Sequence, residues 1–564
     1  MKKFYQKIVE HPKSILTLFI LAAVFSLFCQ RLVHVNYDIK DYLPEKSPST
    51  IALDKMEEEY EGGIPNARVM IRDTSVAEAL EYKEKLEGCP GVVSVTWLDD
   101  AANIEQPLET LDQELAETYY KNGNALFTVT VEEDQVLDAV EAMEEVAGDR
   151  GAMSGDAVST AVATTSTVSE VYKIAAFAVL FVFFVLFLTT TSWAEPVIVM
   201  AGLGIAIAIN AGTNLIFGEI SFVTNAAGNI LQLAVSLDYS VFLIHRFEEC
   251  MKTEETPRKA MVEALCKSTS SILSSGLTTV IGFLALVFMQ FKIGPDLGLA
   301  LAKGVTISLI TVFVFMPVLI LALNGWLMKT HHRRLLPDFH WFGFLVRKIM
   351  LPMTAVFALL VVPSYLASNQ NTFYYGSAYI FGEDTELGRD IAEIEEIFGK
   401  SDTYALMIPR GDKVREEQLS QALHEIPEVT GILSYVDTVG AQIPEEYLDE
   451  ELLSQLLSKD YSRMVLTVDA DAEGEEAFAL VEKIRETADT YYPDSWYLAG
   501  AGVSTYDLMD TISADMVKVN LIAIAAVFVV LLFTMKSFSL PVFLVLAIET
   551  AVWINVSIPY FKDS

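Results

Sequence analysis

The stretch LAVSLDYSVFLIHRFEE, residues 233–249, decides how the rest of the sequence is interpreted. It continues an apolar run that starts near residue 230, and within that run stands one carboxylate, Asp238, followed by Tyr239. A charged side chain in a membrane-spanning helix is costly, so such residues usually face a bundle interior and belong to ion or substrate pathways. The first question is therefore whether this run belongs to a membrane protein.

Apolar runs of membrane-spanning length recur along the chain. Of its 564 residues, 52% are hydrophobic. Nine segments are long enough to cross a bilayer as helices, at about 15–29, 171–189, 196–217, 221–244, 270–291, 297–324, 349–366, 517–534 and 541–560. We therefore predict an α-helical polytopic membrane protein that carries two large polar domains.

The charges give the expected orientation. The net charge of −36 argues against a nucleic-acid partner, and the acidic residues are concentrated in the two polar domains. Short segments beside the spans are basic instead, as at Lys2, Lys3, Arg333, Arg334 and Arg347. By the positive-inside rule the N-terminus faces the cytoplasm, and both polar domains lie on the outer side of the cell membrane.

We expect the first span to be retained. The alternative is a cleaved signal peptide, which Lys2 and Lys3 before an apolar run would fit, but FSLFCQ (25–30) offers no small-residue cleavage site. Of the four cysteines only Cys89 falls in a polar domain, so we expect no disulfide framework there.

Several pairs of matching residues indicate an internal duplication. Met70 and Met407 are 337 residues apart, and so are Pro90 and Pro427. Further along, SGDAVSTA (154–161) matches AGAGVSTY (499–506) at an offset of 345, and IN recurs at 209–210 and 554–555 at the same offset. Ordered matches at a nearly constant offset predict two copies of one unit.

Each polar domain shows the order strand, helix, strand, strand, helix, strand. The first copy has these elements at about 67–72, 75–87, 92–98, 125–131, 134–147 and 150–154. The second has them at about 403–409, 413–424, 430–436, 463–469, 474–488 and 495–500, and each copy carries a helical insert, at 107–120 and 443–458. The pattern predicts two α+β domains with a split β-α-β, ferredoxin-like fold.

The expected organisation follows from the spans and the repeat. It comprises the first span (1–33), an outer domain (34–170), spans two to six (171–324), a cytoplasmic linker (325–348), the seventh span (349–366), a second outer domain (367–516) and spans eight and nine (517–564). At the offset of 345, Ser564 falls opposite Glu219, just before the counterpart of the fourth span. A complete version is therefore expected to carry three more spans, ten to twelve.

These features together resemble the MMPL (mycobacterial membrane protein large) branch of the resistance-nodulation-division superfamily. The resemblance rests on one span before the first outer domain and five after it, and on DYSVFLIHRFEE (238–249), LTTVIGFLAL (277–286) and GPDLGLALAKG (294–304). It implies an exporter driven by the proton gradient, often for lipids or other hydrophobic molecules. The sequence departs from the family at Ala234, where glycine is usual, and in lacking the second Asp-Tyr pair expected in a tenth span.

Asp238 is the expected proton carrier. The sequence contains no nucleotide-binding or zinc-hydrolase motif, so we expect a secondary transporter rather than an enzyme, with no cofactor and no metal. A carboxylate in a low-dielectric bundle can gain a proton from one side and lose it to the other. The family pairs this Asp with Tyr239. The alternative is a structural Asp238 that bonds a neighbouring helix or extends towards the cytoplasm.

Ser274 and Thr278 in the fifth span are candidates for the same relay, because Thr278 is expected at a depth close to that of Asp238. The alternative is helix packing through small residues. Four further polar residues lie within spans. Lys303 is expected to extend to the outer surface, Glu549 lies at mid-depth, and the repeat mates Asn210 and Asn555 are expected to join helices.

We therefore predict a proton-motive-force-driven exporter whose partners are protons, membrane lipids and a hydrophobic substrate, with a second copy of the chain as a further candidate partner. The alternatives are a non-transporting relative that acts as a sensor or assembly partner, and an accessory of protein export.

Overall fold

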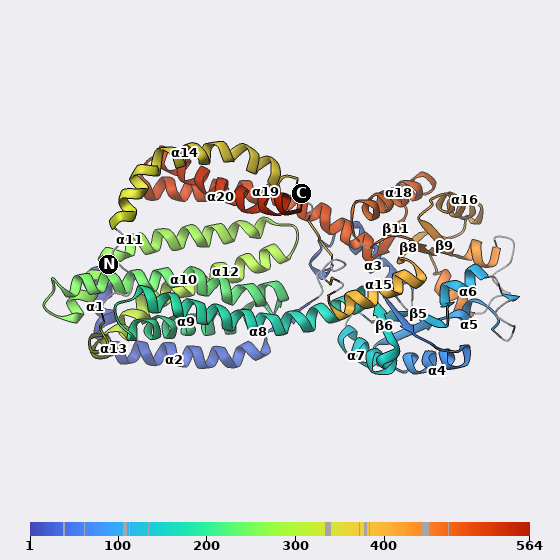
Figure 1. Cartoon of the computed structure of the whole chain (residues 1–564), viewed down its shortest axis with the longest axis horizontal. Coiled ribbons are helices and arrows are strands. Elements are labelled where there is room, and N and C mark those ends of the chain that lie inside the picture. Colours follow the sequence, from blue (N-terminus) through green and yellow to red (C-terminus); the bar gives the residue numbers. More distant parts are fainter. Residues whose placement is uncertain are drawn as a thin grey trace. The chain divides into compact units, whose positions relative to one another are not determined.

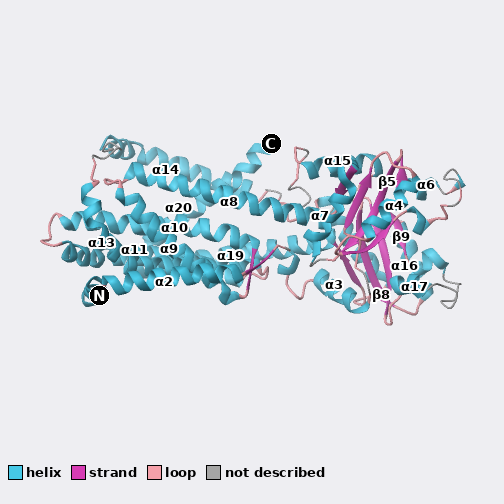
Figure 2. Cartoon of the chain, turned by 90° about the horizontal axis from the view of Figure 1, so that it is seen from below, coloured by secondary structure: helices cyan, strands magenta, loops and turns pink. Residues whose placement is uncertain are grey.

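The structure is a computed structural model that describes residues 1–37, 40–60, 63–104, 106, 110–111, 113–132, 135–332, 340–370, 373–376, 381–382, 384–440, 450–471 and 473–563. The chain forms two compact units (Figures 1 and 2). The membrane unit contains Met1–Tyr37, Val168–Phe373 and Ala514–Ser564, and the polar unit contains Asp38–Thr167 and Tyr374–Ser513. The predicted cytoplasmic linker 325–348 lies partly outside the described residues, because 333–339 are not described.

Eight helices in the described residues are long and apolar enough to cross a membrane, and a ninth, Lys173–Thr189, is apolar but shorter. They correspond in order to the nine predicted spans. The elements are α2 (Pro12–Cys29), α8 (Asp156–Thr189), α9 (Ala194–Thr213), α10 (Phe222–Met251), α11 (Pro257–Leu284), α12 (Ile293–Ile310) with α13 (Met316–Lys329), α14 (His340–Ser368), α19 (Ala501–Met535) and α20 (Ser539–Asp563). A π-helical turn at Thr311–Phe315 joins α12 to α13.

Local sequence sets where these helices begin. Pro257 opens α11, and the Thr256 hydroxyl before it accepts a hydrogen bond from the Lys259 N–H. The Ser221 hydroxyl caps α10 in the same way, by accepting from the Thr224 N–H at 3.1 Å. A short N-terminal helix, α1 (Lys2–Glu10), also packs on α11, where the Tyr5 and Thr269 hydroxyls are 2.7 Å apart. The prediction did not include this helix.

Small residues allow the membrane helices to approach closely. Gly212 of α9 lies against the backbone of Ser26 in α2, where a Cβ atom would come within 2.1 Å of the Ser26 carbonyl oxygen. Such close approaches are typical of helix interfaces in membranes, where packing replaces the hydrophobic effect as the main attraction. Helix α9 packs on α2, α10 and α12, and these four helices run alongside one another in Figure 1.

The chain also pairs two short strands at one end of the membrane unit. β1 (His34–Asn36) lies parallel to β7 (Glu219–Ser221), so the segment that follows α2 pairs with the segment that precedes α10. The predicted fourth span began at 221, inside this strand, and the helix itself begins at Phe222 and continues to Met251. Apolar periodicity alone did not distinguish a short strand from the first turn of a helix.

The first sheet of the polar unit has the strand order β3-β5-β2-β6, and all neighbouring strands are antiparallel. Its elements are β2 (Ala67–Ile71), α4 (Val76–Glu87), β3 (Val92–Thr96), β5 (Asn124–Val131), α7 (Val136–Ala147) and β6 (Gly151–Ser154). Each lies within a few residues of its predicted position. In order along the chain this is a β-α-β-β-α-β arrangement with strand order 4-1-3-2.

The second sheet repeats this order as β11-β8-β10-β9. Its elements are β8 (Asp402–Pro409), α16 (Lys413–His424), β9 (Val429–Leu433), β10 (Tyr461–Val468), α18 (Glu475–Tyr491) and β11 (Tyr497–Gly500). The predicted inserts are shorter than expected in the described residues, where α6 covers Gln113–Tyr119 and α17 covers Glu450–Leu456. Residues 107–109 and 112 of the first insert and 443–449 of the second lie outside the described residues.

One strand was missed although its signal is in the sequence. Asn122 and Gly123 both have positive φ, of 53° and 79°, and they connect β4 (Tyr120–Lys121) to β5 as a two-residue hairpin. An Asn-Gly pair is typical of this tight turn because both residues tolerate the left-handed conformation.

The two sheets exchange one helix each, which the sequence did not predict. The helix α3 (Pro48–Glu59) precedes the first sheet in the chain, but Ala52 and Met56 pack on Ala405 and Met407 of the second sheet. Conversely, α15 (Glu386–Phe398) precedes the second sheet, and its Ile394 packs on the first, against Met70, Leu126 and Ala152. Each sheet is therefore covered on one face by its own two helices and on the other by the exchanged helix.

Candidate functional site

Asp238 lies on an exposed stripe of α10. Leu231, Ala234, Asp238, Phe242 and His245 are all exposed, and their spacing of three and four residues places them on one side of the helix. α9, α11 and α12 pack on the other sides. The expectation that Asp238 faces the enclosed interior of the bundle is therefore wrong for the described residues. We call this side of α10 the Asp238 stripe.

The buried side of α10 is polar at its centre. Gln232, Ser236 and Tyr239 are each 5% exposed or less. The Gln232 Nε2 donates to the Gly304 carbonyl oxygen at 3.1 Å and to the Ser308 hydroxyl at 3.0 Å, which joins α10 to α12. Tyr239 thus faces the packed side while Asp238 faces the stripe, because consecutive residues point about 100° apart around a helix. Gln232 was missed by the sequence reasoning, although an amide in an apolar run was visible there.

Ser274 and Thr278 are half-buried on α11, and their hydroxyl groups are used within that helix. The Thr278 hydroxyl donates to the Ser274 carbonyl oxygen at 2.9 Å, and the Thr279 hydroxyl donates to the Ser275 carbonyl oxygen at 3.1 Å. Within the described part of the chain, no hydrogen bond joins these groups to Asp238. The structure therefore places Asp238 on a helix that packs against α11 without connecting it to the candidate relay hydroxyls.

Lys303 does not extend to the outer surface as expected. Its ammonium group is held inside the bundle by three oxygen atoms, the Asn210 carbonyl at 2.9 Å, the Thr213 hydroxyl at 2.9 Å and the Asn214 side-chain carbonyl at 2.6 Å. Because these acceptors at the end of α9 satisfy the hydrogen bonds of the ammonium group, its internal position is lower in free energy than one extended to the surface. The backbone of Asn210 thus takes part in joining α9 to α12.

The two candidates in the last span differ in exposure. Asn555 is exposed on α20, so it does not join helices in the described residues. Glu549 is half-buried, and its Oε2 atom is buried without a hydrogen-bond partner among the described residues.

Near the C-terminal end of α10, a threonine hydroxyl lies between two carboxyl groups that were not predicted from the sequence. Glu195 in the first turn of α9 is fully buried, and Thr191 lies between it and Glu248. The Thr191 hydroxyl is 3.1 Å from the Glu195 carboxyl group and 2.8 Å from that of Glu248. A hydroxyl carries one hydrogen, so it can donate to only one of them. In the sequence, Glu195 looked like an ordinary acidic residue at a helix N-terminus.

Asp515 in α19 connects the second half of the membrane unit to the first. It is fully buried, and its Oδ2 accepts hydrogen bonds from the backbone N–H groups of Gln290 and Phe291, the latter at 2.8 Å. These two residues lie just before α12, which begins at Ile293. Sequence reasoning missed this contact because it joins positions more than 200 residues apart.

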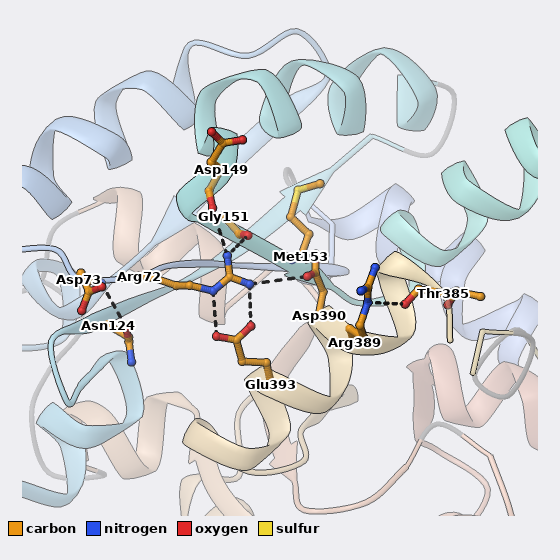
Figure 3. A network of polar contacts seen from close by, with 10 residues as sticks. All are labelled: Arg72, Asp73, Asn124, Asp149, Gly151, Met153, Thr385, Arg389, Asp390 and Glu393. Carbon is orange, nitrogen blue, oxygen red and sulfur yellow. Dashed lines mark hydrogen bonds and ion pairs between the residues drawn. The ribbon is translucent and has the colours of Figure 1, made fainter. Parts of the chain in front are cut away.

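In the polar unit an ion pair fixes the exchanged helix α15 to the first sheet (Figure 3). The Arg72 guanidinium at the end of β2 binds Glu393 through two parallel hydrogen bonds, Nε to Oε1 at 2.8 Å and Nη2 to Oε2 at 2.6 Å. Its Nη1 donates to the Gly151 carbonyl oxygen at 2.6 Å, and the neighbouring Asp390 accepts from the Met153 N–H at 3.2 Å. The hydrogen bond from Arg72 lowers the pKa of Glu393, whereas burial raises the pKa of Asp390.

We expect the Glu393→Gln variant to be less stable at neutral pH, by about 1 kcal/mol or less because the pair is partly exposed and screened. The folded state lowers the pKa of Glu393, so its contribution is present above the ordinary pKa of glutamate and is lost as the pH falls through the lowered value. Thermal unfolding of the detergent-solubilised protein between pH 7 and pH 3 should show the two proteins converging in acid. Asp471→Asn, which removes the exposed pair with Lys400, is the matched control and should change little. A constant difference across the whole range would contradict the assignment.

The comparisons with known proteins give the family. A model of the MMPL family matches residues 41–349 and 380–561. The chain is 29% identical over 133 residues to "Probable transport protein MmpL12" of Mycobacterium tuberculosis, a match covering 23% of this chain and 12% of that protein. It is 24% identical over 348 residues to the membrane protein SCO5905 of Streptomyces coelicolor, covering 58% of this chain and 39% of that protein.

A third relative is the protein translocase subunit SecD of Desulfurispirillum indicum, 33% identical over 97 residues, which covers 17% of this chain and 18% of SecD. The chain thus matches less than half of the length of each of these relatives. The family model, in contrast, covers most of the chain, including the span with Asp238 and both sheets of the polar unit. This protein is therefore a multi-pass membrane protein that belongs to the MMPL family.

Proposed function

We propose that the protein is part of a proton-coupled exporter of lipids or other hydrophobic molecules, with Asp238 as the group that takes up and releases the proton. The observation that carries this proposal is the Asp238 stripe. It places one carboxylate among Leu231, Ala234 and Phe242 on a side of α10 that no described helix covers. The MMPL family and the similarity to a transport protein support the general function.

The energetic cost of exposing Asp238 to lipid indicates what should cover the Asp238 stripe. A carboxylate that faced lipid at this depth would be costly, and side chains of this kind normally face protein or water. We propose that another helix packs on the stripe and completes the proton site. Asp238 would then lie between two helices rather than within the bundle of α9 to α12. Its titration would change the contact between them and so couple the proton gradient to movement.

We further propose that the two sheets of the polar unit are copies of one unit, since both have the strand order 4-1-3-2 and exchange equivalent helices. By the charge pattern we place the N-terminus in the cytoplasm and the polar unit outside the cell membrane. In this arrangement the polar unit would receive the substrate after it leaves the membrane.

The general proposal can be tested by removing the proton gradient. We expect membrane vesicles from cells that express the natural gene product to export a fluorescent lipid only while a pH gradient is imposed. An uncoupler should reduce export to the level of vesicles without the protein. Export that continues after the gradient has collapsed, and that stops when ATP is withdrawn, would contradict the proposal.

A second candidate is an accessory role in protein export, which the similarity to SecD favours. The match covers 97 residues, so it supports a shared membrane segment more than a shared substrate. The two proposals differ in their cargo. Accumulation of unprocessed secreted proteins in cells that lack the protein, with normal lipid composition, would favour the accessory role.

A further inference from the structure

A polar cavity opens at the end of the membrane unit where α2 and α9 end and α10 begins. It has a volume of about 140 Å³, which is room for a few water molecules at about 30 Å³ each. The lining contains no charged side chain, and six of its residues carry an amide or a hydroxyl: Gln30, Asn210, Asn214, Thr224, Asn225 and Asn229. A cavity of this composition favours water over hydrocarbon.

One charge of each sign lies behind the lining. The Asn214 side chain, which faces the cavity, accepts a hydrogen bond from the Lys303 ammonium at 2.6 Å. The Thr224 hydroxyl, also in the lining, donates to the Asp296 carboxylate at 2.7 Å. The Lys303 ammonium and the Asp296 carboxylate each contact a lining residue but do not line the cavity themselves. Their electric fields inside the cavity therefore oppose each other. The cavity therefore favours a neutral occupant over an ion of either sign.

Three buried side-chain oxygen atoms of α9 and α10 lie at the cavity or deeper in the bundle. Asn210, which lines the cavity, is 3% exposed, and its Oδ1 has no partner among the described residues. The same holds for the Gln232 Oε1, with the residue 1% exposed, and for the Ser236 hydroxyl, with the residue fully buried. Buried polar atoms are nearly always hydrogen-bonded to protein or to water, so three unpaired atoms in sequence indicate hydrated positions.

The positions of these residues form a continuous line. Asn225, Asn229, Gln232 and Ser236 are spaced by three and four residues, so they lie on one side of α10. Opposite them Gly304 of α12 has no side chain, and the Asn210 side chain packs against it: a Cβ atom there would come within 2.9 Å of the Asn210 Nδ2. The absence of a side chain at Gly304 thus allows the Asn210 amide, which lines the cavity, to reach the point where α9, α10 and α12 meet.

We propose that this cavity and the line of polar atoms beneath it form a water-access route from the outer side of the membrane to Ser236, two residues before Asp238. The occupant is water, which can both donate to the three unpaired oxygen atoms and accept from the amides of the lining. The route runs inside the first bundle, on the opposite side of α10 from the Asp238 stripe. Its role in supplying protons to Asp238 and the assignment of its opening to the outer side rest on the proposed function, whereas the hydrated path itself does not.

Cysteine labelling tests the route directly. In a background without the four native cysteines, Ser236→Cys and Asn229→Cys should react with a small membrane-impermeant thiol reagent that is added from the outer side of membrane vesicles. Val199→Cys, at a fully buried apolar position of α9, is the control for a site off the route. We expect Ser236→Cys to react at least tenfold faster than Val199→Cys. Equal rates would overturn the proposal.

A cavity-filling variant gives a second, independent test. Gly228 lines the cavity, and a Cβ atom added there would meet no atom within 4 Å. Gly228→Val should therefore place its side chain in the cavity and lower the reactivity of Ser236→Cys at least tenfold. Gly282→Val in α11 is the matched control, because Gly282 also has open space around it and lies away from the cavity. An unchanged reactivity in Gly228→Val would overturn the route through this cavity.

The same measurements distinguish water from another occupant. Reaction of Ser236→Cys in detergent but not in membrane vesicles would mean that a lipid headgroup fills the cavity, and it would overturn the water route. Labelling requires no transport, so the two proposals can fail separately. If Ser236→Cys reacts but Asp238→Asn still exports, the route stands and the proposed proton carrier is wrong.

Discussion

On the proposed function, Asp238→Asn in a version of the protein that carries all twelve spans should reduce proton-dependent export to background. Asn has nearly the same shape as Asp but cannot bind and release a proton near neutral pH. The carboxylate stands alone on its stripe in the described residues, so no neighbouring group on α10 at that depth can take over the proton. Export of a fluorescent lipid and proton uptake should both be measured in vesicles that contain equal amounts of folded protein.

The matched control is His245→Asn, which removes the other titratable side chain of the Asp238 stripe nearly two turns further along the helix. It should leave most of the export activity intact. Stability should not change much in either variant, because Asn can still make hydrogen bonds to a helix that packs on the stripe. Full activity in Asp238→Asn would show that Asp238 is structural. Loss of activity in both variants would assign the effect to the stripe as a contact surface rather than to a proton.

Gly212→Ala should prevent α2 and α9 from packing as they do. The added Cβ atom would lie 2.1 Å from the carbonyl oxygen of Ser26 and 2.4 Å from its Cα atom. Both are backbone atoms, so relief requires one helix to move away from the other. Overpacking of this kind costs on the order of 1–3 kcal/mol. We expect a lower thermal midpoint in detergent and less protein in the membrane.

Gly204→Ala on the same helix is the control, because its added Cβ would meet no atom within 4 Å. Alanine favours a helix over glycine by roughly 0.5–1 kcal/mol, so Gly204→Ala should be neutral or slightly stabilising. If Gly212→Ala were as stable as Gly204→Ala, the close contact between α2 and α9 would not exist in the membrane.

Sequence patterns predicted the elements of this protein better than their contacts. The spans could be read from length and apolarity, which are local properties, and the order of strands and helices followed from periodicity. The strand Tyr120–Lys121 was missed although the Asn-Gly turn beside it could have revealed it. The helices α3 and α15 were missed because their apolar faces pack on strands more than 200 residues away, and no local pattern indicates that partner.

The candidate site was predicted in part. The sequence singled out Asp238 and Tyr239, because a charge in an apolar run is conspicuous, but it could not tell which side of α10 is packed. The structure separates the two side chains onto different sides of the helix. Lys303 was misplaced for a similar reason, since its oxygen acceptors at the end of α9 come from residues about 90 positions earlier.

The exchange of α3 and α15 has a consequence for biosynthesis. The first sheet cannot complete its second face until Ile394 has been made, since that residue covers Met70, Leu126 and Ala152. Six of the apolar helices must be inserted between the synthesis of that sheet and the arrival of its cover. During that time the first sheet has one uncovered apolar face, so we expect a chaperone to bind it during translation.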